Sequence, residues 1–485
     1  MRRVWLIRTA CPLKTNTMRE ETPSPGSSDF LRNKSASSDY VMREARDAGV
    51  RLVRCLWTDL ANIVRGRAIH LDALRRTAID GASIPLHSLG LTVNDQQAMP
   101  NLTGRARMLP DLNTFRVATY APNTGAMMAD VVDMDTQASP LCARSFLKRM
   151  MADLADSGYK AQVGFELEFY FAVRGSDGGF VPVDESGYAT GMGMTVAAKV
   201  INEIIGTLDD QRIAVEHYHP EMGGGQQEIT LRVTDPLTAC DQVVLAREAI
   251  RAVAWTHGWY STFMARPFEN QPGSSLHAHI SLWDRNGRNV MFTDSHHEDE
   301  TLRLYEDGMG FIGGLMRHIN ALAAVSCPSA NSQRRLTGNA GPAPFGAWGY
   351  DNRDVPISIT PQSWSSAKTS ANLEYRLADA SANPYLMLGS VLAAGLDGIQ
   401  THQSHTTALS VSPSQMDEET RAARNIAPLP ATLSEACDAL AADPVLSQAM
   451  GEQMVETYLA IKRKEAATFK DMSFLAEQNA HLWRY

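Results

Sequence analysis

The segment from Gly164 to Phe169 reads GFELEF and places two acidic residues, Glu166 and Glu168, two positions apart in an apolar stretch. Residues two apart on a β-strand project from the same face, so both carboxylates point into one space while their apolar neighbours pack behind them. Two carboxylates this close repel and raise each other's pKa unless a positive charge lies between them. The segment therefore predicts a strand that carries part of a divalent metal site.

The same spacing recurs downstream. His277-Ala278-His279 and Glu374-Tyr375-Arg376 each place two polar side chains on one strand face, and three such strands predict the inner wall of a barrel or cupped sheet. A further segment sets Glu221 and Glu228 around three glycines, which allow the backbone to approach a ligand closely. Carboxylate oxygens with an occasional imidazole suit magnesium or manganese, and these five acids with His277 are enough for two ions.

Each motif alone has a simpler explanation. The two acids could form ordinary ion pairs at a strand end, His277 could be a hydrogen-bonded core residue, and the glycine run could be a turn. The occurrence of all four motifs in one chain, and their order, favours a metal centre.

That order resembles the bacterial type I glutamine synthetases. The similarity is colinear over about residues 50 to 465 and includes these blocks: Gly164 to Phe169, Pro220 to Ile229, Gly273 to His279, Arg334-Arg335-Leu336, Ala347-Trp348-Gly349, Asn352-Arg353, and Asn372 to Gly398.

The resemblance implies an α+β fold in two parts. The composition of residues 1–38 predicts a disordered tail, and the resemblance predicts a small N-terminal β-grasp domain at 39–140. A larger catalytic domain at 141–485 follows, with a cupped antiparallel sheet surrounded by helices. Helix starts are expected at Asp235-Pro236 and Asn383-Pro384, where an N-cap side chain precedes a proline at the first helical position.

The resemblance also implies a site. Its metal ligands are Glu168, Glu221 and Glu228 for one ion and Glu166, His277 and Glu374 for another. Arg335 and Arg376 match arginines that hold glutamate and the transferred phosphoryl group, Gly273 matches a glutamate-contacting backbone position, Arg353 matches a nucleotide-phosphate arginine, and His279 and Ser281 match ATP contacts. Asp59 matches the aspartate that reaches a neighbouring subunit's site and helps to bind ammonium.

The implied reaction is ATP-dependent amide formation. ATP phosphorylates the γ-carboxylate of glutamate, and an amine then displaces phosphate, with two or more Mg²⁺ or Mn²⁺ ions and the arginines compensating the charge on the transferred group. The family's members stack two hexameric rings into dodecamers, so a homo-oligomer of this kind is expected.

The sequence departs from the family around the acceptor. The family's flap glutamate, which takes a proton from ammonium, is replaced by Gly341, a family arginine by Ser358, and the asparagine before Gly273 by Pro272. Ammonium and alkylammonium ions require negative charge, whereas an aniline-like amine is neutral at pH 7 and mainly requires space. We therefore expect an organic amine acceptor, with an aniline-like amine favoured. Asp59 argues partly against this, because one acidic group remains.

Several alternatives stay open. The acceptor could be an alkylamine, ethanolamine or a polyamine, or the chain could be a true glutamine synthetase. In a different class, it could be an inactive scaffold or regulator, although a scaffold has no chemical reason to keep all six metal-ligand positions.

The composition favours a cytoplasmic enzyme that acts on small-molecule substrates. The chain has 485 residues with a formal net charge of −9, which gives no reason to expect nucleic acid or an anionic membrane as partner. The six cysteines form no CxxC pair, as expected of reduced thiols, and no apolar run approaches the roughly 20 residues of a membrane span. Translation could begin at Met18 rather than Met1.

Overall fold

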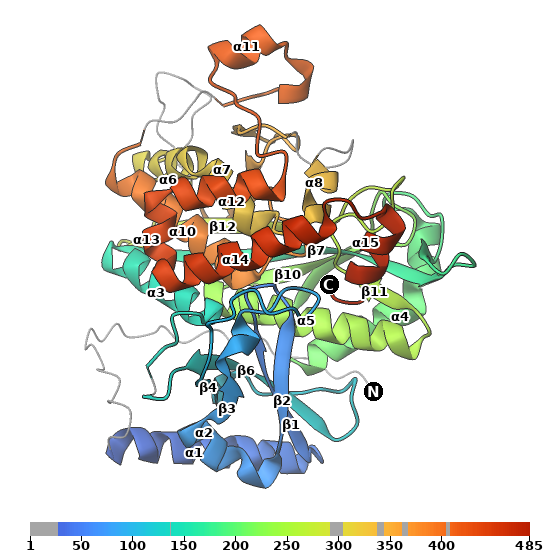
Figure 1. Ribbon diagram of the computed structural model, residues 1–485, viewed down its shortest axis with the longest axis vertical. Coiled ribbons are helices and arrows are strands. Elements are labelled where there is room, and N and C mark those ends of the chain that lie inside the picture. Colours follow the sequence, from blue (N-terminus) through green and yellow to red (C-terminus); the bar gives the residue numbers. More distant parts are fainter. Residues whose placement is uncertain (1–27, 136, 292–303, 337–343, 361–366, 404–407) are drawn as a thin grey trace, which may run out of the picture.

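The computed structural model describes residues 28–135, 137–291, 304–336, 344–360, 367–403 and 408–485 (Figure 1). The chain builds two sheets in succession, a smaller N-terminal one and a larger one that is surrounded by helices. The last strand of the smaller sheet ends at Val132, and the first helix of the larger part begins at Ala143. The predicted α+β class is confirmed.

The N-terminal sheet has the strand order β2-β1-β6-β4-β3, with β5 also paired to β6. Its central pair, β1 and β6, is parallel, and the β1–β2 hairpin is antiparallel. The elements are α1 (Ser28–Asp47), β1 (Leu52–Thr58), β2 (Val64–His70), α2 (Leu74–Asp80), β3 (Ala82–Pro85), β4 (Arg105–Pro110), β5 (Arg116–Val117) and β6 (Thr124–Val132).

Helix α1 already covers residues 28–38, which the sequence analysis assigned to a disordered tail. Its second half buries Val41, Met42 and Ala45 in the hydrophobic core. Burial of that apolar face stabilises a helix that composition alone did not predict, because helices in proteins depend mainly on packing.

The larger sheet has nine strands, with the order β13-β14-β15-β12-β7-β10-β9 and with β8 and β11 both paired to β7. All pairs are antiparallel except β13–β14, which is parallel. The strands are β7 (Tyr159–Arg174), β8 (Phe180–Pro182), β9 (Val215–Pro220), β10 (Gln226–Thr234), β11 (Tyr260–Thr262), β12 (Leu276–Asp284), β13 (Trp348–Tyr350), β14 (Ile357–Ile359) and β15 (Leu373–Tyr375).

Helices cover this sheet, and in Figure 1 the orange and red helices α10, α12, α13 and α14 lie together above the N-terminal sheet. The helices of this part are α3 (Ala143–Asp156), α4 (Gly191–Asp210), α5 (Pro236–Thr256), α6 (Glu306–Arg317), α7 (Ile319–Ser326), α8 (Ala330–Leu336), α9 (Ala367–Ser370), α10 (Pro384–Gln400), α11 (Glu418–Ala423), α12 (Leu433–Ala442), α13 (Pro444–Met450), α14 (Glu452–Phe469) and α15 (Phe474–His481).

Two predicted caps are present as expected. The Asp235 carboxylate accepts a hydrogen bond from the Thr238 amide at 3.1 Å, at the start of α5. The Asn383 side chain accepts from the Tyr385 amide at 3.0 Å, at the start of α10. A proline follows each cap, where its missing N–H costs nothing.

Buried hydrogen bonds hold the two parts of the chain together. Asn62 donates to the carbonyl oxygens of Ser381 and Ala382 at 2.9 and 2.7 Å, and Asn383 donates to the carbonyl oxygen of Asp59 at 2.9 Å. The loop that follows β1 is therefore fixed against the segment that precedes α10.

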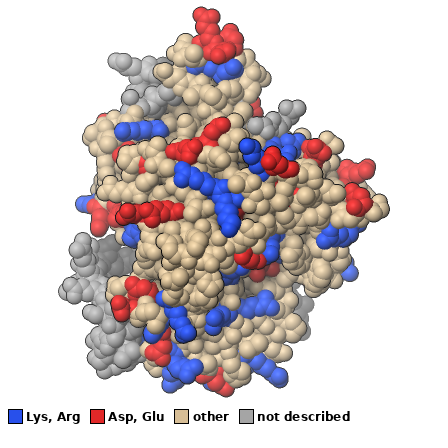
Figure 2. All heavy atoms as spheres, in the orientation of Figure 1, with Lys and Arg blue, Asp and Glu red and all other residues tan. Residues whose placement is uncertain are grey.

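The surface carries charges of both signs, and Figure 2 shows basic and acidic side chains interspersed over the face it draws. Among the described helices, none combines the length and the apolar character needed to cross a membrane. Five cysteines lie in the described segments, and all five are buried free thiols.

Candidate active site

Strand register places the predicted metal ligands in neighbouring rows on the larger sheet. Glu166 on β7 pairs with His277 on β12, and Glu168 pairs with Glu228 on β10. Beyond these, Glu374 on β15 pairs with His279, and His219 on β9 pairs with Glu228. The alternating pattern turns these side chains to one face, because residues two apart on a strand share a face. On β7 the residues that alternate with the two glutamates, Phe165, Leu167 and Phe169, are at most 1% exposed and pack into the core.

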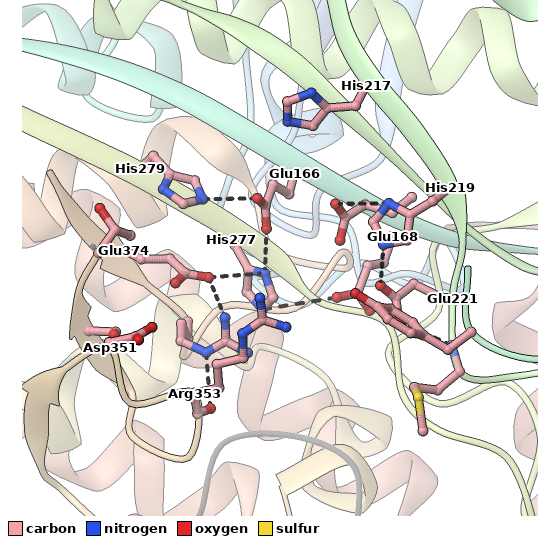
Figure 3. Close-up of a pocket in the computed structure, with 16 residues that line it drawn as sticks. Glu166, Glu168, His217, His219, Glu221, His277, His279, Asp351, Arg353 and Glu374 are labelled. Atoms are coloured by element: carbon pink, nitrogen blue, oxygen red, sulfur yellow. Dashed lines mark hydrogen bonds and ion pairs between the residues drawn. The ribbon is translucent and has the colours of Figure 1, made fainter. Parts of the chain in front are cut away.

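The Glu166 carboxylate lies between two imidazoles, as Figure 3 shows. Its oxygens are 2.9 Å from His277 Nδ1 and 3.0 Å from His279 Nε2. Burial raises the pKa of Glu166, but the hydrogen bonds from both histidines outweigh it and hold the pKa well below the usual range. Burial lowers the pKa of His279, but the bond to Glu166 outweighs it and raises that pKa to about 9.

Two further carboxylates, Glu168 and Glu228, have too little positive charge nearby to balance their burial and mutual repulsion. Burial, followed by repulsion from Glu166, Glu168 and Glu221, raises the pKa of Glu228 to about 9. Burial is also the largest cause that raises the pKa of Glu168. These shifts show that the protein alone leaves negative charge uncompensated in this space.

Divalent cations fit this arrangement. Three groups of side chains bring one ligand atom each within 4.8 Å of one another: Glu166, His279 and Glu374; Glu166, Glu228 and His277; and His219, Glu221 and Glu228. The Nε2 atom of His277 is buried and has no hydrogen-bond partner, as expected of an atom that waits for a ligand. Oxygen-rich groups with single imidazoles suit Mg²⁺ or Mn²⁺.

A cavity of about 510 Å³ opens over these ligands. All six predicted metal ligands line it, together with three further predicted site residues, His279, Arg353 and Arg376. Arg376 forms an ion pair with Glu374 and donates from Nε to the carbonyl oxygen of Arg353 at 3.1 Å. Nine side chains from distant parts of the sequence thus share one space.

Comparison with known proteins agrees with this geometry. The family described as "Glutamine synthetase, catalytic domain" matches residues 140–479. The chain belongs to the glutamine synthetase family. Members of the family are ATP-dependent ligases that form carbon–nitrogen bonds, and this protein is a ligase of that class. The family uses divalent metals and ATP, with which the cluster is compatible.

Two curated relatives span nearly the whole chain. A glutamine synthetase of Halobacterium salinarum is 33% identical over 436 residues, which cover 89% of this chain and 93% of that protein. The gamma-glutamylpolyamine synthetase GlnA3 of Streptomyces coelicolor is 29% identical over 478 residues, which cover 96% of this chain and 100% of that protein.

Solved structures show the same fold. A novel glutamine synthase homolog superposes with a TM-score of 0.79 and 27% identity, and the match covers 90% of this chain and 99% of the homolog. A GmaS/ADP complex superposes with a TM-score of 0.78 and 26% identity, over 91% of this chain and 99% of GmaS.

Two predicted residues of this glutamine synthetase-family site lie directly behind the cavity wall. Arg335 is 1% exposed and donates from Nη1 to the Ser275 hydroxyl at 3.1 Å and from Nη2 to the carbonyl oxygen of Leu377. The amide of Ser275 in turn donates to Glu168 at 2.9 Å. Gly273 packs against Arg335 so closely that there is no space for a Cβ atom.

Ser281 lines a second cavity of about 330 Å³, which shares Glu166, His217 and His279 with the first. The two cavities thus adjoin along this shared wall.

Asp59 does not line either cavity. It is 1% exposed, and its carboxylate accepts from the amides of Ala61 and Ile63 at 3.0 and 2.9 Å and from Arg65 Nε at 2.8 Å. Burial raises its pKa to about 6, although Arg65 and the amides oppose the shift. Gly341, the position of the family's flap glutamate, lies outside the described residues.

Six residues of the cavity lining were not singled out in the sequence: Tyr188, His217, His219, Met222, Asp351 and Thr360. His219 Nε2 is 2.9 Å from Glu221 and Nδ1 is 3.9 Å from Glu228, so the possible ligand groups differ from the predicted pairing of residues. The signal was present for His219, which stands two positions after His217 and two before Glu221 with the same alternation that exposed the other ligands. No sequence pattern distinguishes Tyr188 or Met222.

Proposed function

We propose that this enzyme joins the γ-carboxylate of glutamate to an organic amine, with an aniline-like amine favoured over ammonium. The observation that carries this proposal is the burial and hydrogen bonding of the Asp59 carboxylate. Asp59 is 1% exposed, it lies outside both cavities, and its two oxygens accept three hydrogen bonds, one of them from Arg65 in an ion pair. Together with the glycine at position 341, this leaves neither family acid as a free anion for a cationic acceptor.

The proposed reaction has two steps. A γ-carboxylate oxygen of glutamate attacks the γ-phosphorus of ATP, which forms γ-glutamyl phosphate and releases ADP. The amine nitrogen then bonds to the acyl carbon, phosphate leaves, and the nitrogen loses one proton. Bound Mg²⁺ or Mn²⁺ would compensate phosphate charge in the first step.

Residue roles follow from position. Arg376 reaches the cavity and Arg335 lies behind it, so they are suited to the phosphoryl group and the glutamate carboxylates, for which arginine offers bidentate donors. His279 and Ser281 face the adjoining cavity, where we place the nucleotide, and Arg353 is proposed for its phosphates. The six predicted ligands would hold the ions, and His219 is a further candidate.

A polyamine is the second candidate. The relative in Streptomyces coelicolor is named a gamma-glutamylpolyamine synthetase and matches along its whole length. The cavity lining includes Asp351, a carboxylate that a second ammonium group could approach.

We propose a cytoplasmic dodecamer of two hexameric rings, in which the β1–β2 loop with Asp59 adjoins a neighbour's site. Light scattering after size exclusion tests the assembly, and a monomer that is fully active would refute it.

The decisive experiment measures phosphate release from ATP with glutamate and Mg²⁺ or Mn²⁺ across ammonium, ethanolamine, putrescine, isopropylamine and aniline, with product masses confirmed. Turnover with aniline above that with ammonium supports the proposal, and turnover mainly with ammonium refutes it. In the variant Gly341→Glu, activity with the bulky amine should fall relative to ammonium. Binding of ATP and metal without turnover by any amine would favour a scaffold.

A further inference from the structure

We propose that Tyr188 and Met222 form the binding surface for the apolar body of the acceptor, and that the Tyr188 ring sets the preference for an aromatic amine over ammonium. This inference rests on the proposed function and names the residues that select its substrate.

Both side chains line the main cavity and yet remain open to solvent. Tyr188 is 49% exposed and Met222 is 61% exposed. Tyr188 belongs to the loop between β8 and α4, and Met222 follows Glu221 directly in the turn between β9 and β10. Apolar surface at the opening of an otherwise polar cavity gains free energy when an apolar ligand covers it.

The loop that carries Tyr188 is fixed on the turn that carries Met222. The Ala189 amide donates to the Pro220 carbonyl at 3.0 Å, and the Gly225 amide donates to the Asp184 carboxylate at 3.0 Å. The Tyr188 ring itself stands edge-on to the His219 ring, with centroids 5.5 Å apart and an interplanar angle of 88°. This support pre-organises the ring, which lowers the cost of binding against it.

The Tyr188 hydroxyl has a separate role. It interacts with Arg353 and is the largest cause that raises the pKa of that guanidinium. The ring and the hydroxyl can therefore be tested separately, because phenylalanine keeps the ring and removes only the hydroxyl that interacts with Arg353.

The arrangement of the cavities assigns this surface to the acceptor. The adjoining cavity, where we place the nucleotide, shares Glu166, His217 and His279 with the main cavity but neither Tyr188 nor Met222. The proposed glutamate position is linked to the Met222 turn, since Gln226 donates to the Gly273 carbonyl at 3.0 Å and accepts from the Gly223 amide at 3.0 Å. An amine lying on Met222 is thus near the proposed glutamate position, and the Tyr188 ring lies outside the lining of the adjoining cavity.

The test compares Tyr188→Ala, Tyr188→Phe and Met222→Ala in the full-length enzyme. The first readout is the ratio of kcat/KM for aniline to kcat/KM for ammonium. An aromatic contact of this kind corresponds to about a tenfold change, so the ratio should fall by about that factor in Tyr188→Ala and by less in Met222→Ala. Tyr188→Phe should keep the ratio, and any loss should appear in the KM for ATP.

The second readout is aniline binding without turnover, measured by saturation-transfer NMR with Mn²⁺ replaced by Mg²⁺ and a non-hydrolysable ATP analogue present. Binding that is lost in Tyr188→Ala, in an enzyme that turns over no aromatic amine, would refute the proposed function and support this surface. An unchanged ratio and unchanged binding in Tyr188→Ala, with aniline turned over, would refute the surface and leave the function intact. An enzyme that neither binds nor turns over aniline would refute both.

Discussion

Gly273 offers a direct test of how closely the proposed glutamate site is packed. A Cβ atom at this position would overlap Cγ of Arg335 and would lie 2.7 Å from the carbonyl oxygen of Ala265, where ordinary contact begins at 3.4 Å. In Gly273→Ala the backbone or the arginine must therefore move by more than 0.7 Å. Arg335 is buried and its guanidinium is held by Ser275 and Leu377, so this shift reaches the site.

A displacement that approaches 1 Å in a positioning group costs about 10²-fold in rate, or about 2.7 kcal/mol of transition-state stabilisation. Overpacking should also lower the free energy of unfolding by about 1–3 kcal/mol. We expect kcat/KM for glutamate to fall by about 10²-fold, with a smaller change in the KM for ATP.

The assay is phosphate release under varied glutamate, with thermal unfolding of each variant measured in parallel. Gly206→Ala is the matched control, because Gly206 lies within α4 and has nothing within 4 Å of its would-be Cβ. It should keep full activity and gain about 0.5–1 kcal/mol of stability. Wild-type kcat/KM in Gly273→Ala, at unchanged stability, would refute the reasoning.

Three further outcomes are expected. In His318→Gln, the stability lost relative to wild type should be largest below pH 6.5 and should shrink as pH rises. The reason is that hydrogen bonds to two aspartates outweigh burial and raise the pKa of His318 above 6.5. Urea unfolding across pH measures this difference, and a difference that does not change with pH would contradict the prediction. Arg65→Met should lower the free energy of unfolding by about 3 kcal/mol at pH 8, because it leaves Asp59 buried without its ion pair. The loss should be smaller at pH 5, because burial raises the pKa of Asp59 and the carboxyl can then bind a proton. A loss that does not depend on pH would count against a stabilising ion pair. Mn²⁺ at 100 times its dissociation constant should raise the free energy of unfolding of the wild type by about 2.7 kcal/mol and that of Glu228→Gln by clearly less. Equal stabilisation of both proteins would show that Glu228 is not a metal ligand.

Local pattern was sufficient wherever the signal lay within one segment. The alternation from Gly164 to Phe169 identified β7 and both of its acids, because the two-residue repeat of a strand is a property of the backbone itself. The caps at Asp235 and Asn383 were readable for the same reason, since a cap needs only a side chain and the amides that follow it.

The pairing between strands that are distant in the sequence could not be predicted from the sequence. His219 contributes to the site because β9 lies beside β10 and sets it opposite Glu228, and nothing within its own segment determines that neighbour. Helix α1 was not predicted because its stability comes from a face that is buried in the hydrophobic core and packs beside α2.

The sequence by itself determined the family, the α+β class and the residue types of a metal-assisted ligase, because these follow from ordered motifs and local periodicity. Only the tertiary structure decided which side chains share the cavity, that Asp59 is buried in an ion pair with Arg65, and that Tyr188 and Met222 line the cavity with exposed side chains. The physical reason is that charge compensation and solvent exposure depend on distances across the folded chain, which strand register and loop packing set and which no single segment encodes.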